Sequence, residues 1–245
     1  MIKGIIFDKD GTLINFHALW DGVGARLATE FLERAGLTRD AELEAELSRS
    51  IGVLPDGVAP AGAFACGTYA ECGALFARAL ERFGYGVTDA EAAARLCEIS
   101  DETSCSKTAR YEAVCDLHKL FGDLRTRGIH LGLVTGDTQA AAEYFADRLS
   151  LRGYFDFIEG ADFGAWEPKP HRASADRFRA LTGIRAGELA IVGDSCADMR
   201  FARNADAVAI AVLSGVGGGR ELRETADFVM PNVEYIYEII RRTDI

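Results

Sequence analysis

Long apolar runs are missing from the sequence. No stretch reaches the roughly 18 apolar residues that a membrane-spanning helix needs. The first ten residues contain acidic side chains in place of the apolar core of a signal peptide. We therefore expect a cytoplasmic protein that has no membrane partner.

Paired cysteines and an excess of basic residues are also missing. The six cysteines form no C-x-x-C pair and have no histidines at zinc-finger spacing, so we expect reduced, mostly buried thiols. The 27 lysines and arginines face 38 aspartates and glutamates, which gives a net charge of −11. Binding to a nucleic-acid backbone needs a basic surface, so no nucleic-acid partner is expected. The 49% of hydrophobic residues excludes a disordered chain.

Short apolar segments predict the strands of a parallel sheet. The first, residues 2–7, is too short for a helix and ends in acids, as a buried central strand does at its functional end. Helix-length stretches separate most of the segments, which favours an α/β fold with a Rossmann-like parallel sheet. The five predicted strands cover residues 2–7, 129–135, 155–159, 189–194 and 207–213.

Residues 15–108 interrupt this alternation, because a strand–helix–strand crossover needs only a few dozen residues. Apolar spacing within them predicts four helices, the last with a capping box at 88–91. Residues 52–67 are rich in glycine, proline and alanine, so we expect an irregular connection there. The sequence therefore predicts an inserted helical domain at 15–108 and a core domain formed by 1–14 and 109–245.

Two aspartates follow the first predicted strand in the motif D-x-D-G-T. Asp8 and Asp10 would point to opposite faces of a straight strand, so they serve one site only if the chain turns after Asp8. Gly11 suits such a turn. Taken alone, the motif could also be an ordinary acidic turn.

Three other segments bring polar residues to the ends of strands or to a nearby loop. Thr135 and Gly136 end the second predicted strand and offer a hydroxyl and free N–H groups to an anion, and Thr135 or Asp137 is expected to cap the next helix. Lys169 lies between two prolines, which restrict its loop. Asp194 and Asp198 are one helical turn apart if a helix begins near Ser195.

Carboxylates gathered at one edge need a compensating charge. At about 4 Å, two of them repel by roughly 4 kcal/mol at an effective dielectric constant of about 20. Bringing Asp8, Asp10 and Asp194 together therefore requires protonation or a cation. Oxygen-only ligands favour Mg²⁺, which proteins often hold with a few carboxylates, waters and substrate phosphate.

These motifs, in this order, resemble those of the haloacid dehalogenase superfamily. The resemblance covers residues 1–14 and about 109–240, and the helical insertion is similar to that superfamily's cap domain. Residues 213–217 add a likeness to the phosphoglycolate phosphatase-like branch. The resemblance implies an Mg²⁺-dependent phosphatase acting on a small phosphomonoester, phosphoglycolate-like or a sugar phosphate.

The resemblance also implies roles for the acids. Asp8 would attack phosphorus and form an aspartyl-phosphate, while Asp10 would protonate the leaving oxygen and later activate water. Asp194, Asp8 and the backbone carbonyl of Asp10 would hold Mg²⁺.

Phosphate contacts are implied in the same way. Thr135 and the N–H of Gly136 would bind phosphoryl oxygens, and Lys169 would offset negative charge on the nucleophile and the phosphate. Asp198 would orient Lys169 or a metal-bound water.

An acid at position 10 indicates a phosphatase or a phosphomutase within this superfamily. A sugar phosphomutase would need a further acid–base group from the insertion, for which His17 and Lys107 are weak candidates. A non-catalytic phosphate-sensing module remains a third possibility, although it would have no use for the long insertion. Two departures from the family's usual motifs, Asn15 and the sequence His171-Arg172 after the lysine motif, affect loop geometry and remove no catalytic group.

Overall fold

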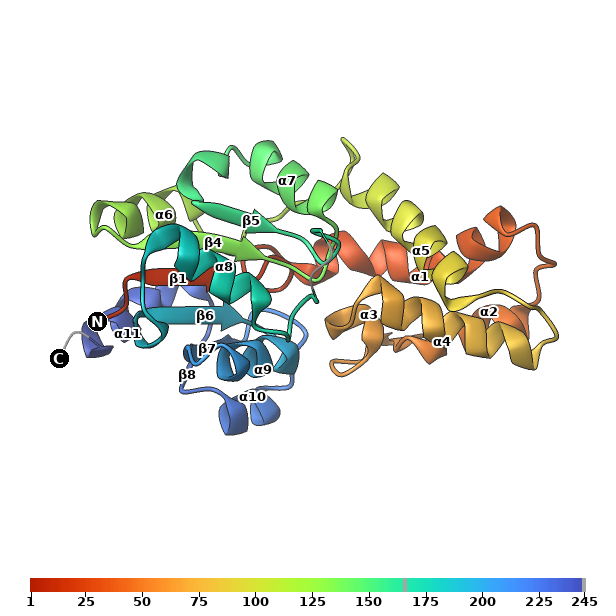
Figure 1. The fold of residues 1–245 in the computed structure, drawn as a ribbon. Coiled ribbons are helices and arrows are strands. Elements are labelled where there is room, and N and C mark those ends of the chain that lie inside the picture. The colour runs from red at the N-terminus through yellow and green to blue at the C-terminus, as the bar shows by residue number, and fades with distance from the viewer. Residues whose placement is uncertain (165–166, 244–245) are drawn as a thin grey trace. The chain divides into compact units, whose positions relative to one another are not determined.

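The computed structural model describes residues 1–164 and 167–243, which form two compact units (Figure 1). The core unit comprises Met1–Phe16 and Tyr111–Ile245, and the helical unit comprises His17–Arg110. The helical unit is thus an insertion in the core unit, whose chain it interrupts once. None of the helices formed by the described residues is long and apolar enough to cross a membrane.

A parallel sheet forms the centre of the core unit. Its strand order is β5-β4-β1-β6-β7-β8, and every neighbouring pair is parallel. β1 lies between β4 and β6, as the red strand in Figure 1 shows. The predicted α/β fold with a parallel sheet is confirmed. The strands are β1 (Gly4–Phe7), β4 (His130–Val134), β5 (Phe157–Glu159), β6 (Leu189–Gly193), β7 (Val208–Val212) and β8 (Phe228–Met230).

The last strand, β8, is missing from the strands that the sequence pattern predicts. It lies at the edge of the sheet and has three residues, of which only Met230 is buried. An edge strand with one hydrogen-bonded neighbour and little burial leaves a short apolar signal, which explains why periodicity does not reveal it.

Helices cover both faces of the sheet. On one face, Phe178 of α8 and Phe201 of α9 share a core cluster with Ile6 of β1. On the other face, Phe121 of α6 packs against Phe7 of β1 with ring centroids 5.5 Å apart. The helices of the core unit are α6 (Leu117–Thr126), α7 (Gln139–Arg148), α8 (Ala173–Thr182), α9 (Cys196–Asn204), α10 (Gly219–Thr225) and α11 (Ile236–Thr243), with 3-10 turns η1 (Arg152–Tyr154), η2 (Ala186–Glu188) and η3 (Val233–Tyr235).

The helical unit has an apolar core of its own, in which Phe31 and Phe76 pack edge to face at 5.1 Å. The capping box predicted at 88–91 is present, since Thr88 accepts from the N–H of Glu91. The expectation of irregular chain over 52–67 is partly wrong. Gly52 and Gly57 both have positive φ there, and a short hairpin and a helix form around them. The elements are α1 (Phe16–Arg34), α2 (Ala41–Ser50), β2 (Val53–Leu54), β3 (Gly57–Val58), α3 (Ala63–Cys66), α4 (Tyr69–Arg82) and α5 (Asp89–Ser104).

The register of the central strands brings three chain segments to one edge. Phe7, the last residue of β1, pairs with Leu133 of β4 and Val192 of β6. Asp8 therefore leaves the sheet beside the ends of β4 and β6. The strand order also reverses at β1, and such a reversal is where open α/β sheets place their binding sites.

Candidate active site

Three buried carboxylates lie together at the carboxyl edge of the sheet. Asp8, Asp194 and Asp198 each offer an oxygen atom, and these atoms lie within 4.8 Å of one another. Lys169 donates hydrogen bonds to Asp8 and, at 2.7 Å, to Asp198 Oδ1. We call Asp8, Asp194 and Asp198 the three-acid cluster. The first follows β1, and the other two flank the start of α9.

Asp194 is held by donors from two loops. Thr12 Oγ1 donates to its Oδ1 at 3.2 Å, and the N–H of Val216 donates to its Oδ2 at 2.9 Å. Glycines leave the room that the carboxylate needs. A Cβ at Gly215 would lie 1.9 Å from Asp194 Oδ2, and one at Gly11, whose φ is +79°, would lie 2.5 Å from the same atom. The D-x-D-G-T motif and the segment around 215 therefore form one wall of the site.

Asp198 is fixed at the start of α9 by a capping box. Ser195 is the N-cap residue, and its hydroxyl and N–H donate to Asp198 Oδ2 at 2.6 and 3.1 Å. The other oxygen of Asp198 accepts from Lys169. With both oxygens bonded, the carboxylate has a defined orientation.

The cluster carries more negative charge than its neighbours offset. Burial, together with the charges of Asp198, Asp194 and Asp10, raises the pKa of Asp8 well above its usual range, although Lys169 opposes this. Burial and the charge of Asp198 raise the pKa of Asp194 to about 7. Burial lowers the pKa of Lys169, but Asp198 and Asp8 outweigh it and raise that pKa, so the ammonium stays charged.

The donor set fits a hard divalent cation. Three carboxylates against one ammonium leave two negative charges uncompensated when all four groups are ionised. The ligand atoms are oxygens alone, the type that Mg²⁺ and Ca²⁺ take and that sulfur-preferring metals do not.

The turn after β4 lies close to the cluster, because Lys169 also donates to the carbonyl of Val134 at 3.4 Å. Thr135 is buried, and its hydroxyl accepts from the N–H of Asp137 at 3.1 Å. The prediction that Thr135 or Asp137 caps the next helix is wrong. Thr138 caps α7 by accepting from Ala141 at 3.0 Å, because the turn places its hydroxyl over the first helical N–H groups.

Asp10 has a different environment from Asp8. The chain turns after Asp8, with the N–H of Leu13 bonded to the carbonyl of Lys9 at 2.9 Å. The Asp10 carboxylate is partly exposed and lies 3.1 Å from Lys9 Nζ, and it is not part of the three-acid cluster.

Lys9 is the residue at this edge that sequence reasoning misses. Its ammonium is fully buried and donates to Asp137 Oδ2 at 2.6 Å. The one signal in the sequence is its position between two acids, where alternation along the chain turns its side chain away from that of Asp8.

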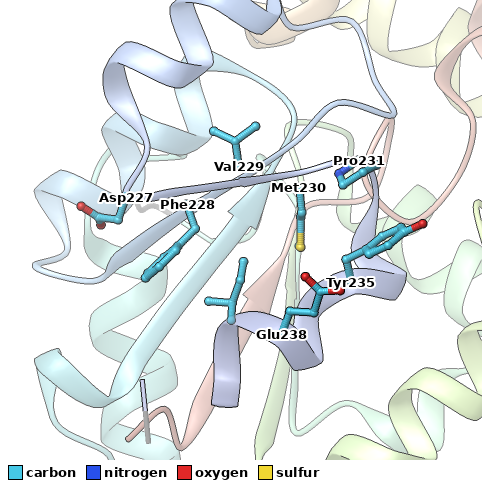
Figure 2. Close-up of a pocket in the computed structure, with 8 residues that line it drawn as sticks. Asp227, Phe228, Val229, Met230, Pro231, Tyr235 and Glu238 are labelled. Atoms are coloured by element: carbon cyan, nitrogen blue, oxygen red, sulfur yellow. The ribbon is translucent and has the colours of Figure 1, made fainter. Parts of the chain in front are cut away.

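A separate pocket lies in the core unit at β8, η3 and α11 (Figure 2). It has a volume of about 280 Å³, and none of the predicted site residues lines it. Its lining residues are Asp227, Phe228, Val229, Met230, Pro231, Tyr235, Glu238 and Ile239.

Comparison with known proteins identifies the family. The sequence model of the haloacid dehalogenase-like hydrolases matches residues 2–206. The chain belongs to this family. The predicted superfamily is therefore confirmed, and the acidic edge of the sheet described above lies within the matched residues.

Relatives with similar sequences include phosphoglycolate phosphatases. The protein of Rhodospirillum rubrum is 29% identical over 222 residues, which are 87% of this chain and 80% of that protein. The protein of Chromobacterium violaceum is 32% identical over 120 residues, 49% of this chain and 53% of that protein. The second alignment thus spans about half the length of its relative. The predicted likeness to phosphoglycolate phosphatases is confirmed.

Solved structures show the same fold. A predicted phosphoglycolate phosphatase from Haemophilus somnus has a TM-score of 0.70 at 18% identity, over 98% of both chains. YfnB of Bacillus subtilis, described as a HAD-hydrolase and solved bound to magnesium, has a TM-score of 0.64 at 18% identity, over 97% of this chain and 98% of that chain.

Proposed function

We propose that this chain is an Mg²⁺-dependent phosphatase that hydrolyses a small phosphomonoester, phosphoglycolate-like or a sugar phosphate. The observation that carries the proposal is the three-acid cluster with Lys169 bonded to two of its members. Phosphoryl transfer needs positioning and charge neutralisation above all, and this edge of the sheet offers both.

The reaction proceeds in two displacements at phosphorus. A carboxylate oxygen of Asp8 forms a bond to phosphorus as the bond to the leaving oxygen breaks, and Asp10 gives that oxygen a proton. In the second step Asp10 takes a proton from water, whose oxygen displaces Asp8 and releases inorganic phosphate. The different surroundings of the two acids support this division, because Asp8 is bonded to Lys169 and Asp10 is partly exposed beside Lys9.

The remaining residues bind the phosphate and the cation. Thr135 and the N–H of Gly136 bind phosphoryl oxygens, and Lys169 offsets charge on the nucleophile. Asp8, the backbone carbonyl of Asp10 and Asp194 hold Mg²⁺, and Asp198 orients Lys169 through their 2.7 Å hydrogen bond. When bound, Mg²⁺ supplies charge neutralisation for the phosphoryl oxygens.

The helical unit acts as a cap domain in this proposal. The support is its position in the chain, inserted after the D-x-D-G-T motif, and its independent apolar core. A unit that folds around its own core can move as a body, so we expect it to supply contacts to the leaving group and to exclude water during transfer.

Phosphate release tests the proposal. Wild type and Asp8→Asn are assayed against phosphoglycolate, sugar phosphates and nucleotides, with Mg²⁺ or with EDTA. We expect Mg²⁺-dependent release that Asp8→Asn abolishes, because an amide is a poor nucleophile. Asp123→Asn, at a surface ion pair with Lys119, is the matched control and keeps wild-type activity.

Each alternative gives its own result. Interconversion of sugar phosphates without phosphate release would indicate a phosphomutase. Binding of phosphate without turnover of any ester would indicate a non-catalytic sensing module. Either result would contradict the proposed hydrolase.

A further inference from the structure

Lys9 is a buried lysine between the two aspartates of the D-x-D motif. Its side chain has no exposure, although lysine is almost never fully buried unless it is paired. Its ammonium lies 2.6 Å from Asp137 Oδ2, 3.1 Å from Asp10 Oδ2 and 5.9 Å from the centroid of the Tyr111 ring. Two carboxylates and one aromatic ring therefore surround the charge.

The ammonium of Lys9 acts as a fixed cation. Carboxylate oxygens of Asp137 and Asp10 lie 2.6 and 3.1 Å from the ammonium, close enough to offset the cost of burying its charge. A buried charge with close partners is costly to separate from them, because the ammonium would then remain buried without these counter-charges. The two carboxylates are therefore tied to the same point.

The partners of Lys9 belong to two different segments of the site. Asp10 lies in the turn after β1, and Asp137 lies in the turn after β4. Asp137 is itself fixed, because its Oδ1 accepts from Thr138 at 2.9 Å and its N–H donates to Thr135 Oγ1. Lys9 thus connects the carboxylate of Asp10 to the turn that carries Thr135.

We propose that Lys9 is a positioning residue that holds the Asp10 carboxylate toward the leaving oxygen of a substrate bound at Thr135. The inference rests on the proposed phosphatase function, in which Asp10 protonates that oxygen. Loss of Lys9 removes a contact that holds the Asp10 carboxylate, and a misplacement of about 1 Å can cost about a hundredfold in rate. A lysine that only joined two turns would, when removed, slow every substrate alike.

Substrates with different leaving groups distinguish a lysine that positions Asp10 from one that only joins two turns. The nitrophenolate of p-nitrophenyl phosphate departs without a proton, whereas an alkoxide needs one from Asp10. The ratio kcat/KM covers the steps up to departure of the leaving group, and so it excludes the later attack of water. We therefore compare kcat/KM for p-nitrophenyl phosphate and for the best aliphatic ester of the panel.

The experiment uses two variants and a control. Lys9→Met removes the charge, and the double variant Lys9→Met/Asp137→Leu also removes one buried carboxylate, which guards against misfolding. Lys119→Met, at the surface ion pair with Asp123, is the control for a lysine-to-methionine change. Folding is checked by circular dichroism and thermal melting.

We expect kcat/KM for the aliphatic ester to fall about 10- to 100-fold in both Lys9 variants, and that for p-nitrophenyl phosphate to change less than about threefold. Equal losses on both esters, or wild-type turnover of the aliphatic ester by a folded variant, would overturn the role of Lys9. Failure of both variants to fold would assign Lys9 to stability and overturn it as well. A wild type that hydrolyses neither ester refutes the proposed phosphatase itself.

Discussion

Replacing Asp194 by asparagine should stabilise the metal-free protein. Asp194 is 2% exposed, and burial with the charge of Asp198 raises its pKa from the ordinary 3.8 to about 7. Ionising this group in the folded protein therefore costs up to about 4 kcal/mol relative to the unfolded chain. An asparagine at this position carries no charge and avoids that cost.

The amide can keep both hydrogen bonds of the carboxylate. Its oxygen can accept from the N–H of Val216, and its NH₂ group can donate to the hydroxyl of Thr12, the two groups that now lie 2.9 and 3.2 Å from Asp194. These bonds are weaker once the charge is gone, by about 1 kcal/mol. We expect Asp194→Asn to raise the free energy of unfolding by about 2–3 kcal/mol at alkaline pH without metal.

The pH dependence has a definite sign. Between 3.8 and about 7 the folded protein retains a proton on Asp194 that the unfolded chain has released. The contribution of this group to stability therefore falls as pH rises through that interval and is constant above it. Asp194→Asn removes this slope.

Urea unfolding in EDTA at about pH 5 and about pH 8 measures the gain in stability and its pH dependence. Repeating the unfolding with Mg²⁺ at the higher pH measures the stability that the cation adds. Wild type should gain stability from Mg²⁺, and Asp194→Asn should not, because a proposed ligand has lost its charge. Asp123→Asn is the matched surface control. A lower stability of Asp194→Asn than of wild type at the higher pH in EDTA, or an equal gain in stability from Mg²⁺, would refute this prediction.

Three further changes test the site and the core. Gly215→Ala places a Cβ 1.9 Å from Asp194 Oδ2, so we expect calorimetric titration to show at least about tenfold weaker Mg²⁺ binding. Unchanged binding would contradict the close contact between residue 215 and the Asp194 carboxylate. Phe121→Ala removes a fully buried ring and should cost about 3–5 kcal/mol in urea unfolding, whereas a cost below about 1 kcal/mol would contradict its core position. Burial raises the pKa of Asp156, but hydrogen bonds led by that from Arg125 lower it overall, so its stabilising effect is present above the ordinary pKa and is lost as pH falls. Asp156→Asn should therefore cost about 1–3 kcal/mol near neutral pH and little in acid, and an equal cost at both pH values in unfolding curves would argue against this.

Elements whose apolar residues follow a regular pattern along the chain could be predicted from the sequence. β1 ends at Phe7 directly before Asp8, and β6 ends at Gly193 directly before Asp194. An apolar run that stops at an acid locates both the strand and its functional end. Because parallel strands end at one edge, the meeting of Asp8 and Asp194 follows from the fold class.

The parts that depend on tertiary contacts could not be predicted. The short edge strand β8 buries only Met230, and the hairpin around Gly57 needs a positive φ that composition does not reveal. The burial of Lys9 depends on Asp137, which is 128 positions away in the chain. Thr138, and not Thr135 or Asp137, caps α7 because the turn after β4 continues past Asp137, and local propensity does not show where it ends.

The central claim is that Asp8 forms an aspartyl-phosphate, and trapping that intermediate tests it most directly. The enzyme is quenched with acid during turnover of its best ester, and its peptides are examined by mass spectrometry. We expect one phosphoryl group on the peptide that contains Asp8, dependent on Mg²⁺ and absent from Asp8→Asn. Turnover without a phosphoryl group on that peptide, or full turnover by Asp8→Asn, would contradict it.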